Sequence, residues 1–220
     1  MILLSGLVGV LLVLTAEAGV GKSSPDNFCT ETKECLTFEK ICETDDYEVR
    51  HYGPVKWVST KEESWSMDYA SMKAFGRLFN YISGENAEGK KIEMTAPVVV
   101  DVPDKWFWEK GIYTMSFLLP SDHQSNPPMP TDKEVYIHES PDMKVYVQSY
   151  GGWMTCVSDG WHAHSLCESL DMADAKYDKD IHYGVGYNSP MALFNRHNEV
   201  WYVVKGEPMC TSSSEEIMLN

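Results

Sequence analysis

The sequence predicts an α+β fold in which two βαββ repeats form a distorted, antiparallel-rich β-barrel or sheet with two flanking helices. Two stretches of the 220-residue chain carry apolar side chains at helical spacing, and strand-like segments precede and follow each of them. The β-segment after each helix contains a proline, and Pro97 and Pro190 lie 93 residues apart. The same offset places residues 69–82 over residues 162–175, helix upon helix, which indicates an internal repeat.

Residues 1–18 predict a secretory signal peptide. They form one apolar run that ends in Ala16-Glu17-Ala18, a small-x-small cleavage pattern, although no Lys or Arg precedes the run. The run is shorter than the roughly 20 residues that a membrane-spanning helix needs, which argues against an anchor. No later segment is apolar enough for a membrane span. We therefore expect a secreted, extracellular protein.

The rest of the chain divides into three regions. Residues 19–46 are expected to form a polar, cysteine-containing N-terminal arm that is dense in Glu and Thr. The folded domain is expected over residues 47–208, with repeats at about 47–120 and 134–206. Residues 209–220 are left as a C-terminal tail. With 12% aromatic and 23% charged residues, the chain is expected to fold rather than remain disordered.

The first repeat begins with a strand and a helix. Residues 47–61 are rich in Val, Tyr and Trp and are interrupted at Gly53-Pro54, as an edge strand with a bend would be. Ser66 is a suitable N-cap, and Gly84 ends an apolar pattern with i, i+3, i+4, i+7 spacing. The residues of this pattern are Phe75, Leu78, Phe79 and Ile82. The β-segments that complete the repeat are 91–102 and 112–119.

The second repeat has the same order of elements. Residues 135–150 are strand-like with a break at residues 140–142, and a helix is expected over residues 158–173. The apolar pattern of this helix consists of Leu166, Leu170 and Ala173, and its N-cap of Ser158 or Asp159. The closing strands are 181–187 and 200–204. Because pseudo-twofold symmetry relates the two halves, the groove between them is the expected ligand site.

The charge balance argues against several partners. The chain has 33 acidic and 18 basic residues, and its formal charge of −15 repels phosphate backbones and anionic lipid. Nucleic-acid binding is therefore not expected.

All six cysteines follow the signal peptide, in what is expected to be an oxidising compartment. Six cysteines allow 15 disulfide connectivities, and the sequence does not select one. Spacings of six residues among the first three match no C-x-x-C zinc pattern. We expect disulfides to hold the N-terminal arm, and also the tail, to the folded body. The disulfide candidates are Cys29, Cys35, Cys42, Cys156, Cys167 and Cys210.

The sequence shows no motif for catalysis, so a binding protein rather than an enzyme is expected. It has no Gly-x-Ser-x-Gly elbow, no glycine-rich phosphate loop between strand and helix, and no cysteine that is obviously available as a nucleophile. Adjacent carboxylates such as Glu62 and Glu63 point in opposite directions in a strand. His162 and His164 face different sides of a helix, so we do not expect them to share a metal.

A helical stripe and one histidine are the candidate ligand-binding residues. Twelve Met, seven Trp and twelve Tyr suit a large flat apolar ligand, although they equally suit a core. On the first helix, Lys73 and Arg77 lie beside apolar side chains and could hold two carboxylates, such as those of a porphyrin. His51 stands at a strand end next to the Gly53-Pro54 bend, where it either faces a groove as a metal ligand or lies on the surface. The apolar residues of the stripe are Met67, Met72, Phe75 and Phe79.

Four blocks of the domain occur in the order seen in a known family. They are YEVRHYGPVKWV at 47–58, KIEMTAPV at 91–98, GYNSP at 186–190 and NRHNEVW at 195–201. In these blocks the chain closely resembles the SOUL haem-binding family. The resemblance implies a distorted β-barrel of two βαββ repeats with two flanking helices, which agrees with the repeat derived above.

The resemblance also implies a function, which is the binding of haem or a related tetrapyrrole without catalysis. In the SOUL branch, the histidine of the Tyr-Glu-x-Arg-His-Tyr-Gly-Pro pattern is the proposed axial haem ligand, and here that position is His51. Other members hold haem in an apolar groove without a protein ligand. The signal peptide and six cysteines distinguish this chain from the cytosolic members, so their intracellular roles are not expected of it.

Two other functions remain open. A secreted interaction protein without a pigment would bind an extracellular partner through the arm and through exposed aromatic residues such as Trp106-Phe107-Trp108. A hydrolase for small apolar molecules on the same fold would need a carboxylate that faces the groove.

Overall fold

The computed structural model describes residues 19–24, 28–106 and 108–210. The expected signal peptide at 1–18 and residues 211–220 of the expected tail lie outside these residues. The elements are β1 (Val20–Lys22), β2 (Glu34–Leu36), β3 (Glu39–Glu43), β4 (Glu48–Tyr52), β5 (Lys56–Ser64), α1 (Met67–Ser83), β6 (Val98–Pro103), β7 (Gly111–Leu118), α2 (Ser121–Gln124), β8 (Val135–Glu139), β9 (Met143–Tyr150), α3 (Cys156–Met172), β10 (Ile181–Gly186) and β11 (Asn198–Val203).

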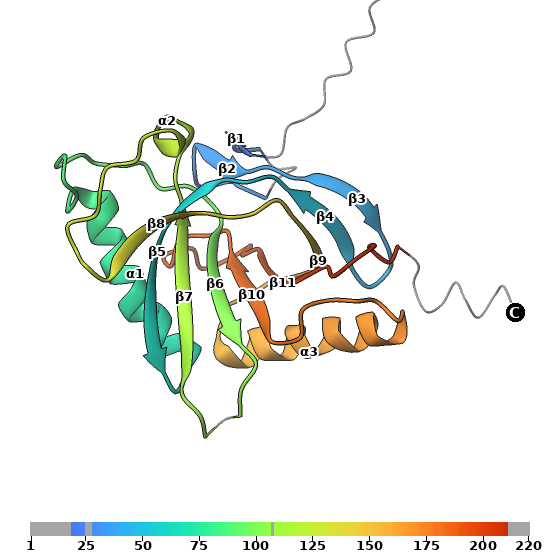
Figure 1. Ribbon diagram of the computed structural model, residues 1–220. Coiled ribbons are helices and arrows are strands. Elements are labelled where there is room, and N and C mark those ends of the chain that lie inside the picture. The colour runs from blue at the N-terminus through green and yellow to red at the C-terminus, as the bar shows by residue number, and fades with distance from the viewer. Residues whose placement is uncertain (1–18, 25–27, 107, 211–220) are drawn as a thin grey trace, which may run out of the picture.

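Nine of the described strands form one antiparallel sheet in the order β3-β4-β9-β11-β10-β6-β7-β5-β8 (Figure 1). The predicted α+β class with a sheet-rich core is therefore confirmed. The sheet does not close into a barrel, because β3 and β8 are its two edges and do not pair with each other. The face that a closed barrel would enclose is covered instead by the segment before β3, whose Phe28 and Leu36 pack there.

The strand order shows the internal repeat. From the central pair β6–β10, the sheet reads β6, β7, β5, β8 on one side and β10, β11, β9, β4 on the other. Each repeat contributes its first strand to the opposite half, because β4 pairs with β9 and β8 pairs with β5. The two repeats, each of which has the order ββαββ because its first predicted strand divides in two, therefore interlock around a pseudo-twofold axis that passes between β6 and β10.

The offset between the repeats differs from the predicted 93 residues. The helices begin 89 residues apart, at positions 67 and 156, and the first strands begin 87 apart, at positions 48 and 135. Pro97 immediately precedes β6, whereas Pro190 follows β10, so the two prolines are not equivalent. Strands β6 and β10 begin only 83 residues apart because the connection from α1 to β6 is longer than the connection from α3 to β10.

Several predicted strands have different boundaries. Segments 47–61 and 135–150 each divide at their predicted bend, into β4 with β5 and β8 with β9. Segment 91–102 is a strand only from Val98 onward, and the preceding Ala96–Pro97 peptide bond is cis. Since proline has no N–H to donate to a strand ladder, β6 begins after Pro97.

Both long helices begin at a side-chain cap. Ser66 accepts a hydrogen bond from the Tyr69 backbone N–H at the start of α1, as predicted. Helix α3 begins earlier than predicted, because Thr155 is its N-cap and forms a capping box with Ser158. Asp159 is not the cap: it is buried and bonds to side chains of the sheet.

Both helices cover the same face of the sheet (Figure 1). The register pairs Val100 of β6 with Gly184 of β10, and directly paired residues point to one face. Val100 belongs to the cluster that includes the buried side of α1, while Asp159 of α3 lies against Gly184. The opposite face includes Val99 and Val185 and packs against the segment before β3.

Residues before Tyr47 take part in this fold. β3 pairs with β4, and Cys29, Cys35 and Leu36 are buried in the cluster on the face without helices. One disulfide joins Cys29 to Cys35, and a second joins Cys42 of β3 to Cys210. The second disulfide holds the N-terminal arm and the C-terminal tail together at the edge of the sheet.

Cys156 and Cys167 are free thiols. Both lie on α3, eleven positions apart, so the helix separates them by about 16 Å along its axis. A disulfide needs Cα atoms within about 7 Å, which a straight helix does not allow here. No described helix has both the length and the apolar character needed to cross a membrane.

Candidate functional site: the cleft between the two helices

A cleft of about 560 Å³ lies over the centre of the sheet, between the beginning of α1, helix α3 and the connection from β6 to β7. Its floor is formed by side chains of four neighbouring strands, which are Val102, Tyr113, His182 and Tyr202. Its walls include Trp65, Met67, Cys156, Ala163 and Cys167. The cleft thus lies between the two repeats, which is the region in which the sequence predicts a ligand groove.

Two lysines line this cleft. The Nζ of Lys105 donates to the backbone carbonyl oxygens of Trp65 at 3.2 Å and Glu109 at 2.7 Å, neither of which carries a net charge. Lys179 pairs with Asp171 at 2.7 Å, and this contact raises the pKa of Lys179. Asp104 also lines the cleft, so the rim carries both signs of charge, and Lys105 is the cation on it that an anionic ligand group can meet.

The floor contains a buried histidine–carboxylate pair. His182 Nε2 lies 2.8 Å from Asp159 Oδ2, and the two side chains are 11% and 1% exposed. Tyr150 donates a weaker bond to Asp159 Oδ1 at 3.4 Å, and burial beside this carboxylate raises the pKa of Tyr150. A Cβ atom on Gly184 would lie 2.7 Å from Asp159 Oδ1, so glycine is what allows α3 to approach β10 this closely.

Two thiols also line the cleft. Cys167 Sγ lies 2.8 Å from the Tyr177 hydroxyl, which donates to Asp171 at 2.9 Å. The Asp68 carboxylate raises the pKa of the Cys156 thiol, which disfavours the thiolate. Within the described ranges, no three His, Cys, Asp or Glu side chains form a group that could hold a metal ion.

The apolar stripe predicted on the first helix divides between three environments. Met67 is buried in the wall of the cleft. Phe75 packs against Phe117 of the sheet, with the ring centroids 5.2 Å apart, and so belongs partly to the core. Met72 and Phe79 are 66% and 50% exposed on the outer side of α1.

The two predicted cations of this helix share one carboxylate. Lys73 and Arg77 both pair with Glu62 of β5, and the Arg77 contact measures 2.9 Å. Lys73 and Arg77 together hold the pKa of Glu62 below its usual range, against the effect of burial. Two cations and one carboxylate leave one net positive charge on this outer surface of α1. Neither Lys73 nor Arg77 lines the cleft.

His51 is not among the residues that line the cleft. It lies on β4, and strands β9 and β11 separate β4 from β10. Its Nε2 lies 2.8 Å from Asp142 Oδ2 and its Nδ1 lies 3.7 Å from Glu39 Oε2, with 26% of the side chain exposed. The structure thus does not bring His51 together with the predicted residues of α1.

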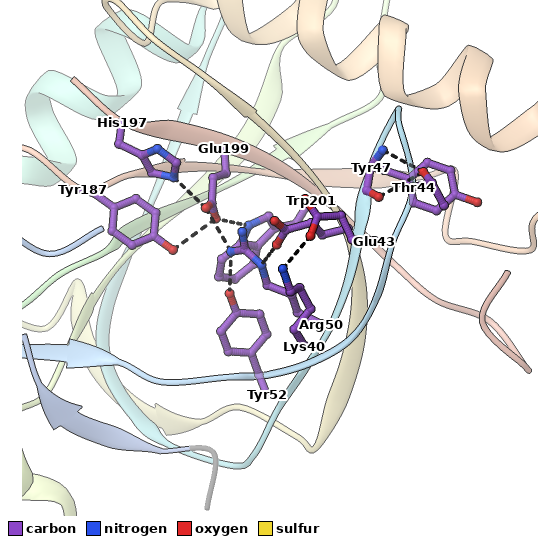
Figure 2. Close-up of polar contacts among 11 residues, drawn as sticks. Lys40, Glu43, Thr44, Tyr47, Arg50, Tyr52, Tyr187, His197, Glu199 and Trp201 are labelled. Atoms are coloured by element: carbon purple, nitrogen blue, oxygen red, sulfur yellow. Dashed lines mark hydrogen bonds and ion pairs between the residues drawn. The ribbon is translucent and has the colours of Figure 1, made fainter. Parts of the chain in front are cut away.

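Three of the four sequence blocks, 47–58, 186–190 and 195–201, meet instead around a buried ion pair (Figure 2). Arg50 Nη1 lies 2.9 Å from Glu199 Oε1, and neither side chain is exposed to solvent. Tyr187 and Trp201 donate to Glu199 Oε2 at 3.1 and 2.7 Å, and His197 Nε2 lies 2.7 Å from Oε1. Each carboxylate oxygen of Glu199 therefore has two hydrogen-bonding partners within the protein.

The charge of this cluster is held by its surroundings. Burial acts to raise the pKa of Glu199, but Arg50, His197 and Trp201 hold it below its usual range. The Arg50 guanidinium also lies 4.1 Å from the centre of the Phe38 ring, which belongs to the segment before β3. The cluster ties β4 to β11 and to this segment, so its role is structural.

A family model described as "SOUL heme-binding protein" matches residues 33–203. The chain belongs to the SOUL haem-binding family. "Heme-binding protein 2" of Homo sapiens is 40% identical over 163 residues, which cover 74% of this chain and 80% of that protein. "Heme-binding protein 1" of Xenopus laevis is 30% identical over 158 residues, covering 71% of this chain and 83% of that protein.

One solved structure shows the same fold at low sequence identity. The C-terminal domain of EcmrR is 10% identical, and the superposition covers 78% of this chain and all of that domain with a TM-score of 0.54. This similarity supports the assignment of the SOUL fold and gives no information on the ligand.

Sequence reasoning missed the pair in the cleft floor. The sequence pattern indicates only a capping role for Asp159, and it places His182 in no cluster of specific spacing. The two residues are 23 positions apart, on a helix and a strand whose packing is not a local property of the sequence. The signal that could have indicated their approach is Gly184, because a glycine in a strand often marks a place where another group comes close.

Proposed function

We propose that the protein is a secreted carrier of haem or a related tetrapyrrole, and that the ligand lies in the cleft between α1 and α3. The observation that carries the proposal is the cleft itself, on the pseudo-twofold axis of a SOUL fold. Catalysis is not part of the proposal, because the curated relatives are named for binding haem.

The chemistry of the cleft suits a flat, anionic ligand. Trp65, Met67 and Tyr113 offer aromatic and thioether surface that packs well against a planar ring. Lys105 supplies a cation for a propionate carboxylate. His164, which also lines the cleft, has an imidazole that is 72% exposed, and its Nε2 lies 3.3 Å from Glu168 Oε1, a carboxylate that would orient the ring toward iron. The volume of about 560 Å³ lies well within the range of small-molecule sites.

His51 is the alternative iron ligand. It would place the tetrapyrrole at the edge of the sheet near β3 and β4, and Asp142 would orient the imidazole as a carboxylate does in many metal sites. The exposed face of α1, with Met72 and Phe79 beside Lys73 and Arg77, is a third position for the macrocycle.

A hemin titration separates these positions. We expect a saturable shift of the Soret band with the chain from residue 19 onward, and an affinity about tenfold lower in Lys105→Glu, which reverses a charge in the cleft. Lys90→Glu is the matched control, because Lys90 is exposed and lines none of the cavities described for this protein. His51→Ala should keep its Soret shift.

Each result has one meaning. Loss of the shifted band in His51→Ala, with Lys105→Glu unchanged, would move the ligand to the edge of the sheet. Weaker binding only in Lys73→Glu or Arg77→Glu would move it to the outer face of α1. Absence of any saturable shift would overturn tetrapyrrole binding.

Secretion is tested separately. Expression of the whole chain in secretory cells should release into the medium a protein whose N-terminus is Gly19, as mass spectrometry would show. Retention of residues 1–18 in a cell-associated product would contradict this part of the proposal.

An extracellular protein partner is the second candidate function. Trp106 and Trp108 are 65% and 54% exposed and stack on each other with ring centroids 5.1 Å apart. Exposed tryptophans of this kind are common at the centres of protein interfaces. If hemin does not bind, a partner from extracellular fluid should be captured by the unaltered chain and lost with Trp106→Ala and Trp108→Ala.

A further inference from the structure

A second cavity, of about 310 Å³, lies on the face of the sheet without helices. It is lined from the same central strands as the cleft: Asp101 of β6 and Tyr183 of β10 face it, whereas the neighbouring Val102 and His182 face the cleft. Side chains alternate along a strand, so the two cavities are on opposite sides of one sheet. A ligand in one does not compete for space with a ligand in the other.

Aromatic rings form much of the wall of this cavity. Trp57, Tyr183 and Trp201 line it, together with the thioether of Met143. The indole N–H of Trp57 donates to Ser140 Oγ at 3.2 Å, and that of Trp201 donates to Glu199 Oε2 at 2.7 Å. Because both N–H groups already have partners, a ligand can meet the two indoles only through their ring atoms. Trp57 is 4% exposed and Trp201, which stacks on Tyr52, is fully buried, so the less buried Tyr183 offers more of its ring.

The charged groups that line the cavity are both acidic. Asp178 is paired with Lys205 at 3.3 Å, so its charge is balanced. Asp101 accepts a hydrogen bond from Thr114, and no described cation lies within ion-pair distance of it, although Lys61 is close enough to favour its ionised form. Burial raises the pKa of Asp101 to about 6, which still leaves it mostly ionised at neutral pH.

The remaining polar groups are neutral at that pH. His138 Nδ1 lies 3.1 Å from Ser59 Oγ. Burial lowers the pKa of His138, and the positive charge of Lys61 lowers it further. Burial also raises the pKa of Tyr183 to about 12. A negatively charged carboxylate thus stands among aromatic rings, which is the environment that binds organic cations.

We propose that this cavity is a second ligand site, which takes a small organic cation with one aromatic ring, such as an arylalkyl ammonium ion. The ammonium group pairs with the Asp101 carboxylate, and the ring packs against Tyr183 and Trp57, close to Trp201. The volume is at the lower limit of small-molecule sites and is little more than half that of the cleft, so the site selects a ligand much smaller than a tetrapyrrole.

The test compares three probes of similar shape and different charge: benzylamine, benzyl alcohol and benzoate. Calorimetric titration of the chain from residue 19 onward should show saturable binding of benzylamine at pH 7.5, at least tenfold weaker binding of benzyl alcohol, and none of benzoate. In Asp101→Asn, which keeps the size of the side chain and removes its charge, benzylamine affinity should fall at least tenfold. Asp174→Asn is the control, because Asp174 is exposed and its positive φ suits either residue.

The location is tested by NMR. Benzylamine should shift the indole N–H resonances of Trp57 and Trp201 and leave that of Trp153, which is outside this cavity, in place. Thermal unfolding of Asp101→Asn shows whether the variant is folded. Equal affinity for benzylamine and benzyl alcohol, unchanged affinity in Asp101→Asn, or shifts confined to Trp153 would each overturn the proposal.

The dependence of benzylamine affinity on pH is an independent test. Between pH 7.5 and pH 5, Asp101 gains a proton because its pKa is about 6. Burial lowers the pKa of His138, so this side chain resists protonation, and any proton that it gains adds a positive charge that repels the ammonium group. Tyr183 stays neutral because burial raises its pKa to about 12. Benzylamine affinity should fall about tenfold at pH 5, and a constant affinity would contradict the assignment of Asp101.

Discussion

At the scale of single residues, two neighbouring positions of the sequence block at 47–58 have different roles. Arg50 and Glu199 are fully buried and are joined to each other, whereas the neighbouring His51 is partly exposed and bonded to Asp142. Alternation along β4 explains the difference, because successive side chains point to opposite faces. One position of the block therefore stabilises the fold, and the next is available at the surface.

The buried pair predicts a large loss of stability when one partner is removed. Glu199→Gln leaves the buried Arg50 guanidinium with one carboxylate partner, the partly exposed Glu48 at 2.6 Å from Nε. The free energy of unfolding should therefore fall by up to the about 3 to 5 kcal/mol that breaking a buried pair costs. Urea unfolding at pH 7.5 measures this change. Glu43→Gln removes the carboxylate of an exposed pair with Lys40 and should have no measurable effect. Equal effects of the two substitutions would contradict the structural role of Glu199.

At the scale of elements, the contact of α3 with β10 shapes the floor of the cleft. Gly184 leaves room for Asp159, and Asp159 in turn holds His182. The position of the helix over the sheet therefore depends on one residue without a side chain.

Two glycine substitutions test this dependence. Gly184→Ala places a Cβ atom 2.7 Å from Asp159 Oδ1 and should destabilise the protein by about 1 to 3 kcal/mol. Gly76→Ala, inside α1 with no atom near its added Cβ, should stabilise by about 0.5 to 1 kcal/mol. Thermal and urea unfolding give both values. If both variants were stabilised, Gly184 would not be needed for the approach of α3.

At the scale of the whole molecule, one disulfide joins the beginning of the domain to its end. Cys42 and Cys210 are 168 positions apart, and the loop that they close contains both repeats. β3, at the edge of the open sheet, has β4 as its only partner among the described strands, so this bond also fixes the edge.

Removal of this disulfide should lower stability strongly. The double substitution Cys42→Ser and Cys210→Ser releases a long loop in the unfolded chain, and the free energy of unfolding should fall by about 2 to 5 kcal/mol. Cys156→Ser, which changes an exposed free thiol, is the matched control and should have little effect. Denaturant unfolding without reductant measures both. A double variant as stable as the unaltered chain would contradict the role of this bond.

Features that depend on residues close together in the sequence could be predicted, and features that depend on contacts between distant segments could not. The first helix, with its Ser66 cap and its Gly84 end, and the bends at 53–54 and 140–142 were predicted, because each depends on residues within one turn. The sequence left the choice between a barrel and a sheet open, and the offset of 93 residues was wrong, because both depend on strand pairing and loop lengths. His51 as a ligand stays a prediction, as does the stripe on α1.

Local patterns were sufficient to predict two repeats, each with one long helix, and the family. Periodicity, caps and short sequence blocks involve residues that lie close together in the sequence. The tertiary structure decided which distant side chains meet. Arg50 reaches Glu199 across 149 positions, His182 reaches Asp159 from another element, and Asp101 and Tyr183 face the same cavity. These contacts arise from the exchange of first strands between the repeats and from the packing of α3 on β10, which no segment of the chain specifies alone.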